Sequence, residues 1–291
     1  MRARVRLISM NKLSRDKQIE VVKCLVEGNS LRSTSRITGV ARNTVSKLIL
    51  DFGAACEKFH DETVHGLTTK RVECDEIWSY VGKKDAQCTS GELATVGVGS
   101  VWTWTAIDAD SKLIVSWLIG GRDGEYAYAF MCDVADRLAN RVQLTTDAHS
   151  AYFTAVREAF AGEVDYAMLV KKYGKGESGS EVRYSPAICT GIEKKPKMGK
   201  PDKDLISTSY VERQNLSMRM GMRRFTRLTN GFSKSIEFHA ASVAIYFVHY
   251  NFVRVHQTLR CSPAMEAGVM KHLWDIGNMV DLLDTRDLTV E

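Results

Sequence analysis

From residue 71 onward, strand-like and helix-like segments follow one another in an order that few folds accommodate. The strand-like segments are rich in β-branched and aromatic residues, and the helix-like segments repeat apolar residues every three or four positions. The predicted order is strand 71–81, strand 94–107, strand 113–119, helix 125–138, strand 141–146, helix 151–160 and strand 166–170. Residues 108–111 join the second and third strands as a hairpin. This order predicts a mixed α/β fold in which helices flank a five-stranded mixed sheet.

Residues 171–204 interrupt this pattern with a polar, Gly- and Lys-rich stretch that holds three of the four prolines. We expect a long basic loop there. Two helical segments follow it, at 207–222 and 233–255.

The first 53 residues have a different pattern, because three helical segments precede any strand. The first spans 14–27, the second 30–38, and the third begins at Ala41 after a Gly-containing turn. This spacing is typical of a helix-turn-helix domain. The outward residues of the third helix would contact phosphates and base edges, and they are Arg42, Asn43, Thr44, Ser46 and Lys47. The alternative is a small helical bundle with a polar outer face.

The net charge of +5 is unevenly distributed, and two segments of the chain are strongly basic. Residues 1–60 carry 12 Lys/Arg against 5 Asp/Glu, and residues 194–227 carry 10 against 3, which leaves the rest of the chain acidic. Two basic segments on an acidic body favour a polyanionic partner contacted at two places. The alternative is a pair of solvated basic faces.

Three carboxylates occupy positions that suit metal-dependent phosphoryl transfer. Asp75 lies within the first strand, Asp147 ends the fourth strand, which should pair beside the first, and Glu212 lies in the first turns of the helix after the basic loop. Divalent ions need hard oxygen ligands from rigid elements. Individually each carboxylate also fits a turn, a cap or a surface group. Glu76 competes with Asp75, since neighbours on a strand face opposite sides and only one should point to the site.

The helix that carries Glu212 adds polar groups suited to a nucleic-acid backbone. Asn215 and Arg219 share the face of Glu212, at i+3 and i+7. Further basic side chains would extend this surface, and they are Arg213, Arg223, Arg224 and Arg227. The alternative is a solvated arginine-rich helix and turn. Two histidines, His149 and His256, are candidates for auxiliary roles, although structural hydrogen bonding explains such residues equally well.

Five segments together resemble the bacterial transposases of the insertion-sequence-one family: VECDEIWSYV, VWTWTAIDADSKL, LTTDAHSAY, STSYVERQNLSMRMGMRRFTRLTNGFS and YNFVRVHQTLRCSPAMEAG. The resemblance runs from about residue 12 to 270. It implies a ribonuclease-H-like fold with an Asp-Asp-Glu triad, which falls on Asp75, Asp147 and Glu212. The basic residue seven positions after the glutamate falls on Arg219.

The resemblance also implies an activity. Such an enzyme binds the terminal inverted repeats of its element, frees 3′-OH ends and joins them to target DNA with two Mg²⁺ ions, for which Mn²⁺ substitutes. Because two ends must meet, we expect a dimer or larger assembly. Many members carry an N-terminal zinc module, but the seven scattered cysteines contain no C-x-x-C, so we expect no zinc. The rival interpretations are a non-catalytic DNA-binding regulator and a plain metal-dependent nuclease.

These patterns divide the chain into five parts. They are an extension (1–11), a helix-turn-helix domain (12–53), a linker (54–70), a catalytic domain (71–260) with the insertion 171–204, and a tail (261–291). The basic start is followed by no apolar signal segment, and Met10 offers an alternative start. No apolar run is long enough to span a membrane, so we expect a bacterial cytoplasmic, nucleoid-associated protein.

Overall fold

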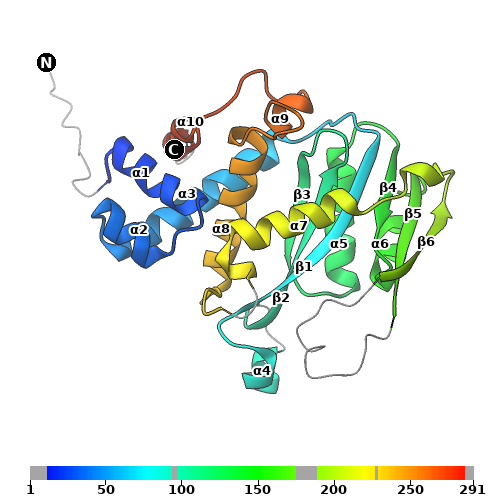
Figure 1. Cartoon of the computed structure of the whole chain (residues 1–291), viewed down its shortest axis with the longest axis horizontal. Helices are drawn as coiled ribbons and strands as arrows, with labels where there is room; N and C mark the ends of the chain where they lie inside the picture. The colour runs from blue at the N-terminus through cyan, green and yellow to red at the C-terminus, as the bar shows by residue number, and fades with distance from the viewer. Residues whose placement is uncertain (1–11, 94–96, 175–188, 227–228, 286–291) are drawn as a thin grey trace, which may run out of the picture.

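The computed structural model describes residues 12–93, 97–174, 189–226 and 229–285. Within these residues one sheet has the strand order β3-β2-β1-β4-β5-β6 (Figure 1). The strands are β1 (Arg71–Val81), β2 (Gly99–Asp108), β3 (Ile114–Gly120), β4 (Val142–Thr146), β5 (Val164–Tyr173) and β6 (Cys189–Met198). The first three strands are antiparallel, whereas β4 and β5 run parallel to β1.

Helices cover both faces of the sheet, which makes the fold mixed α/β, as predicted. The crossovers between the parallel strands are α5 (Gly124–Arg137) and α6 (Ser150–Ala159), and both lie behind the sheet in Figure 1. On the opposite face, α7 (Ser209–Gly221) crosses the central strands. Helices on both faces explain why β1 is buried along most of its length.

The prediction of five strands and a loop at 171–204 is wrong in part. Strand β5 continues to Tyr173, and β6 pairs with it as a sixth, antiparallel strand. Lysines and Pro196 hid this strand from the pattern, but an edge strand tolerates both, since one side of its backbone is unpaired. Residues 175–188 of the predicted loop lie outside the described residues.

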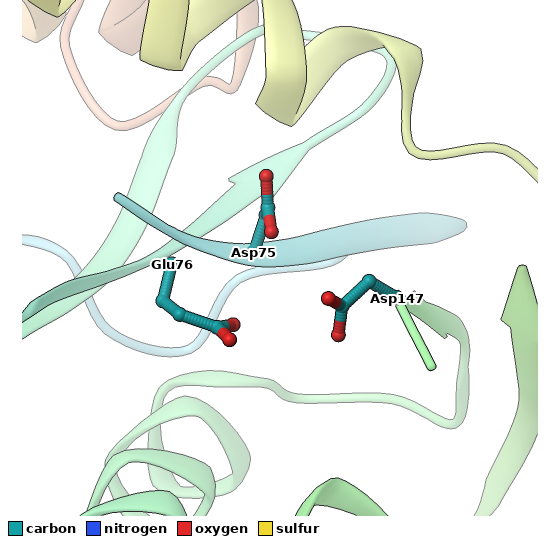
Figure 2. Close-up of side chains that lie close together, drawn as sticks. All are labelled: Asp75, Glu76 and Asp147. Atoms are coloured by element: carbon teal, nitrogen blue, oxygen red, sulfur yellow. The ribbon is translucent and has the colours of Figure 1, made fainter. Parts of the chain in front are cut away.

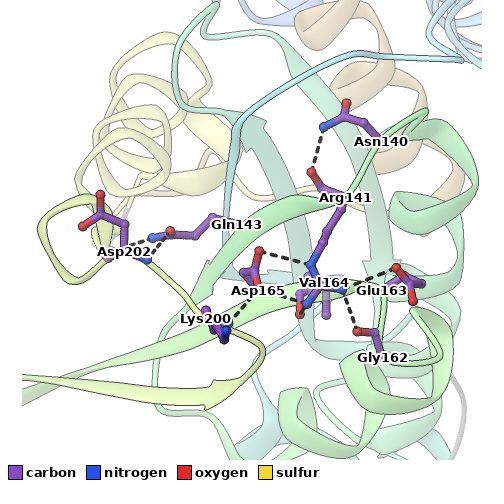
Figure 3. Close-up of polar contacts among 9 residues, drawn as sticks. All are labelled: Asn140, Arg141, Gln143, Gly162, Glu163, Val164, Asp165, Lys200 and Asp202. Carbon is purple, nitrogen blue, oxygen red and sulfur yellow. Dashed lines mark hydrogen bonds and ion pairs between the residues drawn. The ribbon is translucent and has the colours of Figure 1, made fainter.

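Polar contacts fix the end of β6 to the neighbouring strands (Figure 3). Arg141 donates to both Asp165 carboxylate oxygens, at 2.9 and 3.1 Å. Asp165 also accepts from the Lys200 N–H at 2.8 Å. Gln143 and Asp202 exchange two hydrogen bonds through the Gln143 amide, at 2.8 and 3.0 Å. The segment that leaves β6 is therefore held against the start of β4 and β5.

The N-terminal region forms the three predicted helices, α1 (Arg15–Val26), α2 (Leu31–Thr38) and α3 (Arg42–Thr63). Ser14 caps α1, and Gly39 ends α2 with a φ of 72°. The third helix is longer than predicted, because it continues through the first ten residues of the expected linker. Its Gly53 lies against Ala241, where a Cβ would come within 2.4 Å of the alanine Cβ. This close approach packs α3 on α8 (Ile236–Val248). The linker boundaries at 54–70 remain a prediction.

The C-terminal region is more ordered than the predicted tail. Helix α8 (Ile236–Val248) runs into a π turn (His249–Val253), and α9 (Pro263–Glu266) and α10 (Ile276–Thr285) follow. Met279 and Val280 of α10 are buried in the same apolar cluster as Val22 of α1. Arg15 of α1 pairs with Asp281 of α10 at 2.6 Å. Helix α10 thus packs on the N-terminal helices instead of forming an extended tail.

The remaining described elements are short turns: η1 (Asp85–Gln87), α4 (Ser90–Leu93), η3 (Lys203–Leu205) and η4 (Arg223–Phe225). Among the described residues, none of the helices combines the length and the apolar character that crossing a bilayer requires.

Candidate active site

Strand β1 presents carboxylates to both faces of the sheet. Glu73 and Asp75 point toward α7, because Glu73 Oε2 accepts from the Tyr210 and Val211 N–H groups and Asp75 Oδ2 accepts from Asn215 Nδ2 at 2.8 Å. Glu76 points to the other face. The alternation of a strand accounts for this division.

Asp147 lies where β4 ends beside β1. The parallel register pairs Cys74 with Thr146, so the next residue on each strand is Asp75 or Asp147. The Asp147 carboxylate is directed toward β1 (Figure 2). Oxygen atoms of Asp75, Glu76 and Asp147 all lie within 4.8 Å of one another. The predicted proximity of the two aspartates follows from this pairing.

The expectation that only one of Asp75 and Glu76 could reach the site is wrong. Asp147 comes after the last paired residue of β4, so it lies at the strand end, where side chains from either face of β1 can approach it. The longer Glu76 side chain covers the additional distance. Strand alternation fixes the starting direction of a side chain but not where a flexible carboxylate ends.

Burial and mutual repulsion make this cluster a site for positive charge. Burial, followed by the charges of Glu76 and Asp147, raises the pKa of Asp75 to about 7. Burial and the charge of Asp147 also raise the pKa of Glu76, although hydrogen bonds from Tyr152 and Arg122 oppose this effect. Closely spaced hard oxygen donors with raised pKa values are suited to Mg²⁺, Mn²⁺ or Ca²⁺. The donor set therefore fits a divalent ion.

Glu212 lies near this cluster but outside the group of carboxylates whose oxygens converge within 4.8 Å among the described residues. Its Oε2 accepts from Lys171 Nζ, and its Oε1 accepts from Thr208 Oγ1. Its charge still contributes to the raised pKa of Asp75. Glu212 therefore faces Asp75 from α7, with a lysine at its carboxylate.

Glu73 fixes the helix that carries Glu212, a role that the sequence analysis missed. The N-cap Thr208 makes no capping bond with its side chain. Instead Glu73 Oε2 accepts from the Tyr210 N–H at 2.7 Å and the Val211 N–H at 3.1 Å. A carboxylate at a helix N-terminus satisfies exposed N–H groups and complements the helix dipole. The i, i+2 spacing of Glu73 and Asp75 was the available sequence signal.

Arg122 was also missed, because it lies in the turn between β3 and α5. Its Nε donates to Glu76 Oε1 at 2.6 Å, and its Nη2 lies 4.0 Å from Asp147 Oδ2. The guanidinium stacks on Trp102, 4.5 Å from the ring centroid. It also lines an open hollow of about 450 Å³ together with His149 and the first residues of α5 and α6. Arg122 thus balances the charge of Glu76 at the rim of this hollow.

The two predicted auxiliary histidines have structural partners. His149 Nδ1 accepts from the Ala151 N–H at 3.3 Å and so caps α6, while its ring packs edge-on against Trp104. The His149 N–H also donates to Asp147 Oδ1 at 2.9 Å. His256 lies in a turn, where Nδ1 is 3.0 Å from Thr258 Oγ1. Of the two, only His149 contacts a residue of the carboxylate cluster through a described hydrogen bond.

The predicted DNA-contact residues differ in exposure: some side chains are exposed, some are half-buried and one is buried. On α3, Arg42, Asn43 and Lys47 are exposed, whereas Thr44 and Ser46 are half-buried. On α7, Asn215 is buried and donates to Asp75, and Arg219 is half-buried.

The arginines after α7 differ from one another. Arg223 is exposed, but Arg224 donates to Ser233 Oγ at 2.9 Å and to the Phe238 carbonyl at 3.2 Å. These bonds turn Arg224 inward, so it braces the turn after α7. Arg227 lies outside the described residues.

Comparison with known proteins gives distant structural likenesses. No family model matches the chain, and no curated protein matches it. A piggyBac transposase synaptic complex with hairpin DNA is 11% identical, with a TM-score of 0.42 and coverage of 98% of this chain and 76% of that chain.

Two structures of the Mos1 transposase are also similar. The paired-end complex with the left transposon end is 12% identical over 53% of this chain and 59% of that chain, with a TM-score of 0.23. The strand transfer complex is 11% identical over 82% and 78%, with a TM-score of 0.24. At these TM-scores the likeness does not assign the chain to a family, so its membership of the insertion-sequence-one family remains a prediction.

Proposed function

We propose that the chain is a DNA transposase that binds the terminal inverted repeats of an insertion sequence, cleaves to expose 3′-OH ends and joins these ends to target DNA. The observation that carries this proposal is that Asp75, within β1, meets Asp147, at the end of the adjacent parallel strand β4, while α7 brings Glu212 close enough for its charge to act on Asp75. Carboxylates gathered in this way suit two-metal phosphoryl transfer on nucleic acid.

In this proposal Asp75, Asp147 and Glu212 hold two Mg²⁺ ions, or Mn²⁺ in their place. When bound, the ions supply Lewis-acid stabilisation of the attacking and leaving oxygens. Asn215 orients Asp75 through its amide N–H, and Glu73 fixes α7, which sets the position of Glu212. Arg122 neutralises the buried Glu76 carboxylate. These groups act mainly by positioning, on which phosphoryl transfer depends.

The basic segments supply the DNA contacts in this proposal. The exposed start of α3 reads the terminal repeat, and Arg219 and Arg223 contact phosphates beside the carboxylates. Because two ends are processed together, the active form is a dimer or larger assembly.

A double substitution, Arg42→Ala with Lys47→Ala, tests whether α3 contacts the DNA. If both side chains contact phosphates, end binding weakens and the slope of log K against log salt flattens by about 1.8. Fluorescence anisotropy over a series of salt concentrations measures both effects. The matched control removes two exposed lysines outside α3, Lys84 and Lys271, by alanine substitution. Equal binding by the two double variants would remove α3 from the recognition surface.

The proposed reaction is tested with DNA that carries the inverted repeats flanking the gene. The protein should nick this DNA only with Mg²⁺ or Mn²⁺ present, and the freed 3′ ends should become joined to a second, labelled DNA. Nicking without joining would instead identify a nuclease. End binding without nicking would identify a DNA-binding regulator.

A further inference from the structure

Lys171 is a strand residue on the same face of the sheet as Glu212. Two residues and four residues earlier on β5, Leu169 and Ala167 pack against Ile206, just before α7. Lys171 continues this row, and its ammonium donates to Glu212 Oε2. The two side chains are 28% and 37% exposed, so the contact is partly shielded from solvent. The neighbouring Lys172 is exposed and pairs with Glu193 at 3.3 Å.

The charge of Lys171 is attracted by more than one carboxylate. Burial lowers the pKa of Lys171, but the hydrogen bond and charge of Glu212, followed by more distant charges that include Asp75, raise it above its ordinary value. Lys171 is therefore protonated at neutral pH. Its ammonium lies where a cation is attracted by Glu212 and Asp75 together.

We propose that Lys171 is a built-in counter-ion that holds Glu212 and must release it before a divalent ion can bind there. This inference rests on the proposed function, because it takes Glu212 to be a metal ligand. Glu212 Oε1 is already engaged by Thr208, so Oε2 is the oxygen for which the ammonium and a metal ion compete. An ammonium and a divalent ion cannot occupy the same side of one carboxylate oxygen.

The two metal positions are consequently unequal. The position between Asp75 and Asp147 has two carboxylates with oxygens within 4.8 Å of each other, and the neighbouring cation, Arg122, donates to Glu76 and lies 4.0 Å from Asp147. The position at Glu212 has a lysine directly on its carboxylate. We therefore expect one ion to bind tightly and the second to bind weakly, in that order.

The experiment measures Mn²⁺ binding to the full chain without DNA, from the electron paramagnetic resonance signal of free Mn²⁺. Lys171→Met removes the charge and keeps the length of the side chain. This variant should lower the Mn²⁺ dissociation constant of the weak class of sites about five- to tenfold, or make a second class detectable where the wild type shows only one. The dissociation constant of the tight class should change less than twofold. Lys171→Arg restores the cation and should bind like the wild type. Lys172→Met removes a neighbouring charge and should also bind like the wild type.

Thr208→Ala separates competition from orientation, because it removes a hydrogen bond from Glu212 without changing charge. This variant should weaken the second class. Lys171→Gln provides the same charge removal if the methionine variant folds poorly, as judged by circular dichroism. Unchanged or weaker binding of the second ion by these charge-removing variants would overturn the inference. If the wild type binds no Mn²⁺, or if Asp75→Asn and Asp147→Asn leave its Mn²⁺ binding unchanged, the proposed function itself is overturned.

Discussion

Asp147→Asn should abolish DNA cleavage while end binding is retained. Asp147 supplies one of the converging carboxylates, and its replacement removes a negative charge and an oxygen ligand from the cluster. We expect strand cleavage in Mg²⁺ to fall by about three orders of magnitude or more, which corresponds to about 4 kcal/mol in the activation free energy. End binding should stay within about twofold of the wild type, since the predicted reading residues lie on α3.

Gel-based cleavage under single-turnover conditions and anisotropy binding on the same DNA measure the two quantities separately. Asp136→Asn is the matched control, because Asp136 is an exposed aspartate on α5 away from the carboxylate cluster. It should cleave like the wild type. Normal cleavage by Asp147→Asn would refute the assignment of the site, whereas parallel loss of binding and cleavage would point to a damaged fold.

Asp75→Asn should stabilise the protein above neutral pH when divalent ions are absent. The pKa of Asp75 is raised from 3.8 to about 7, so the native state holds a proton between these pH values that the unfolded chain has lost. The free energy of unfolding of the wild type therefore falls as pH rises from about 4 to 7. One pKa unit corresponds to about 1.4 kcal/mol, so the free energy of unfolding falls by about 4 kcal/mol in total over this range. An amide at this position does not ionise, and its oxygen can still accept from Asn215.

Urea unfolding of both proteins at pH 5 and pH 8, with a chelator present, measures this effect. The difference between variant and wild type is the useful quantity, because it cancels other titrating carboxylates such as Asp165, whose pKa is lowered. Asp75→Asn should gain about 2–4 kcal/mol relative to wild type at pH 8 and much less at pH 5. Added Mg²⁺ should stabilise the wild type but not the variant. An equal difference at both pH values would contradict the raised pKa.

Local patterns were sufficient to predict much of the fold and the proximity of Asp75 and Asp147. The order of strands and helices after residue 71 led to the mixed sheet, and the parallel pairing of β1 with β4 placed Asp75 beside Asp147. The sixth strand was missed because lysines and a proline masked it, and these residues are acceptable only because β6 lies at an edge. A neighbouring chain segment, rather than local composition, makes that stretch a strand.

The partners of the carboxylates could not be predicted in the same way. Lys171 and Glu212 are 41 residues apart, and Arg122 and Glu76 are 46 apart. Asn215 was expected to contact DNA, and that contact remains a prediction, but its amide donates to Asp75. Such contacts depend on side-chain rotamers and on the distance between packed elements, and neither is encoded in the spacing of residues along the chain.

The amino-acid sequence by itself determined most of the strands and helices and placed two aspartates on neighbouring strands, because hydrophobic periodicity is a local property of the chain. Tertiary packing alone decided how the charges are balanced: Glu76 reaches the same cluster as Asp75, Glu73 caps α7, and Lys171 holds Glu212. Electrostatic contacts form between groups that folding brings within a few ångströms, whatever their separation in sequence.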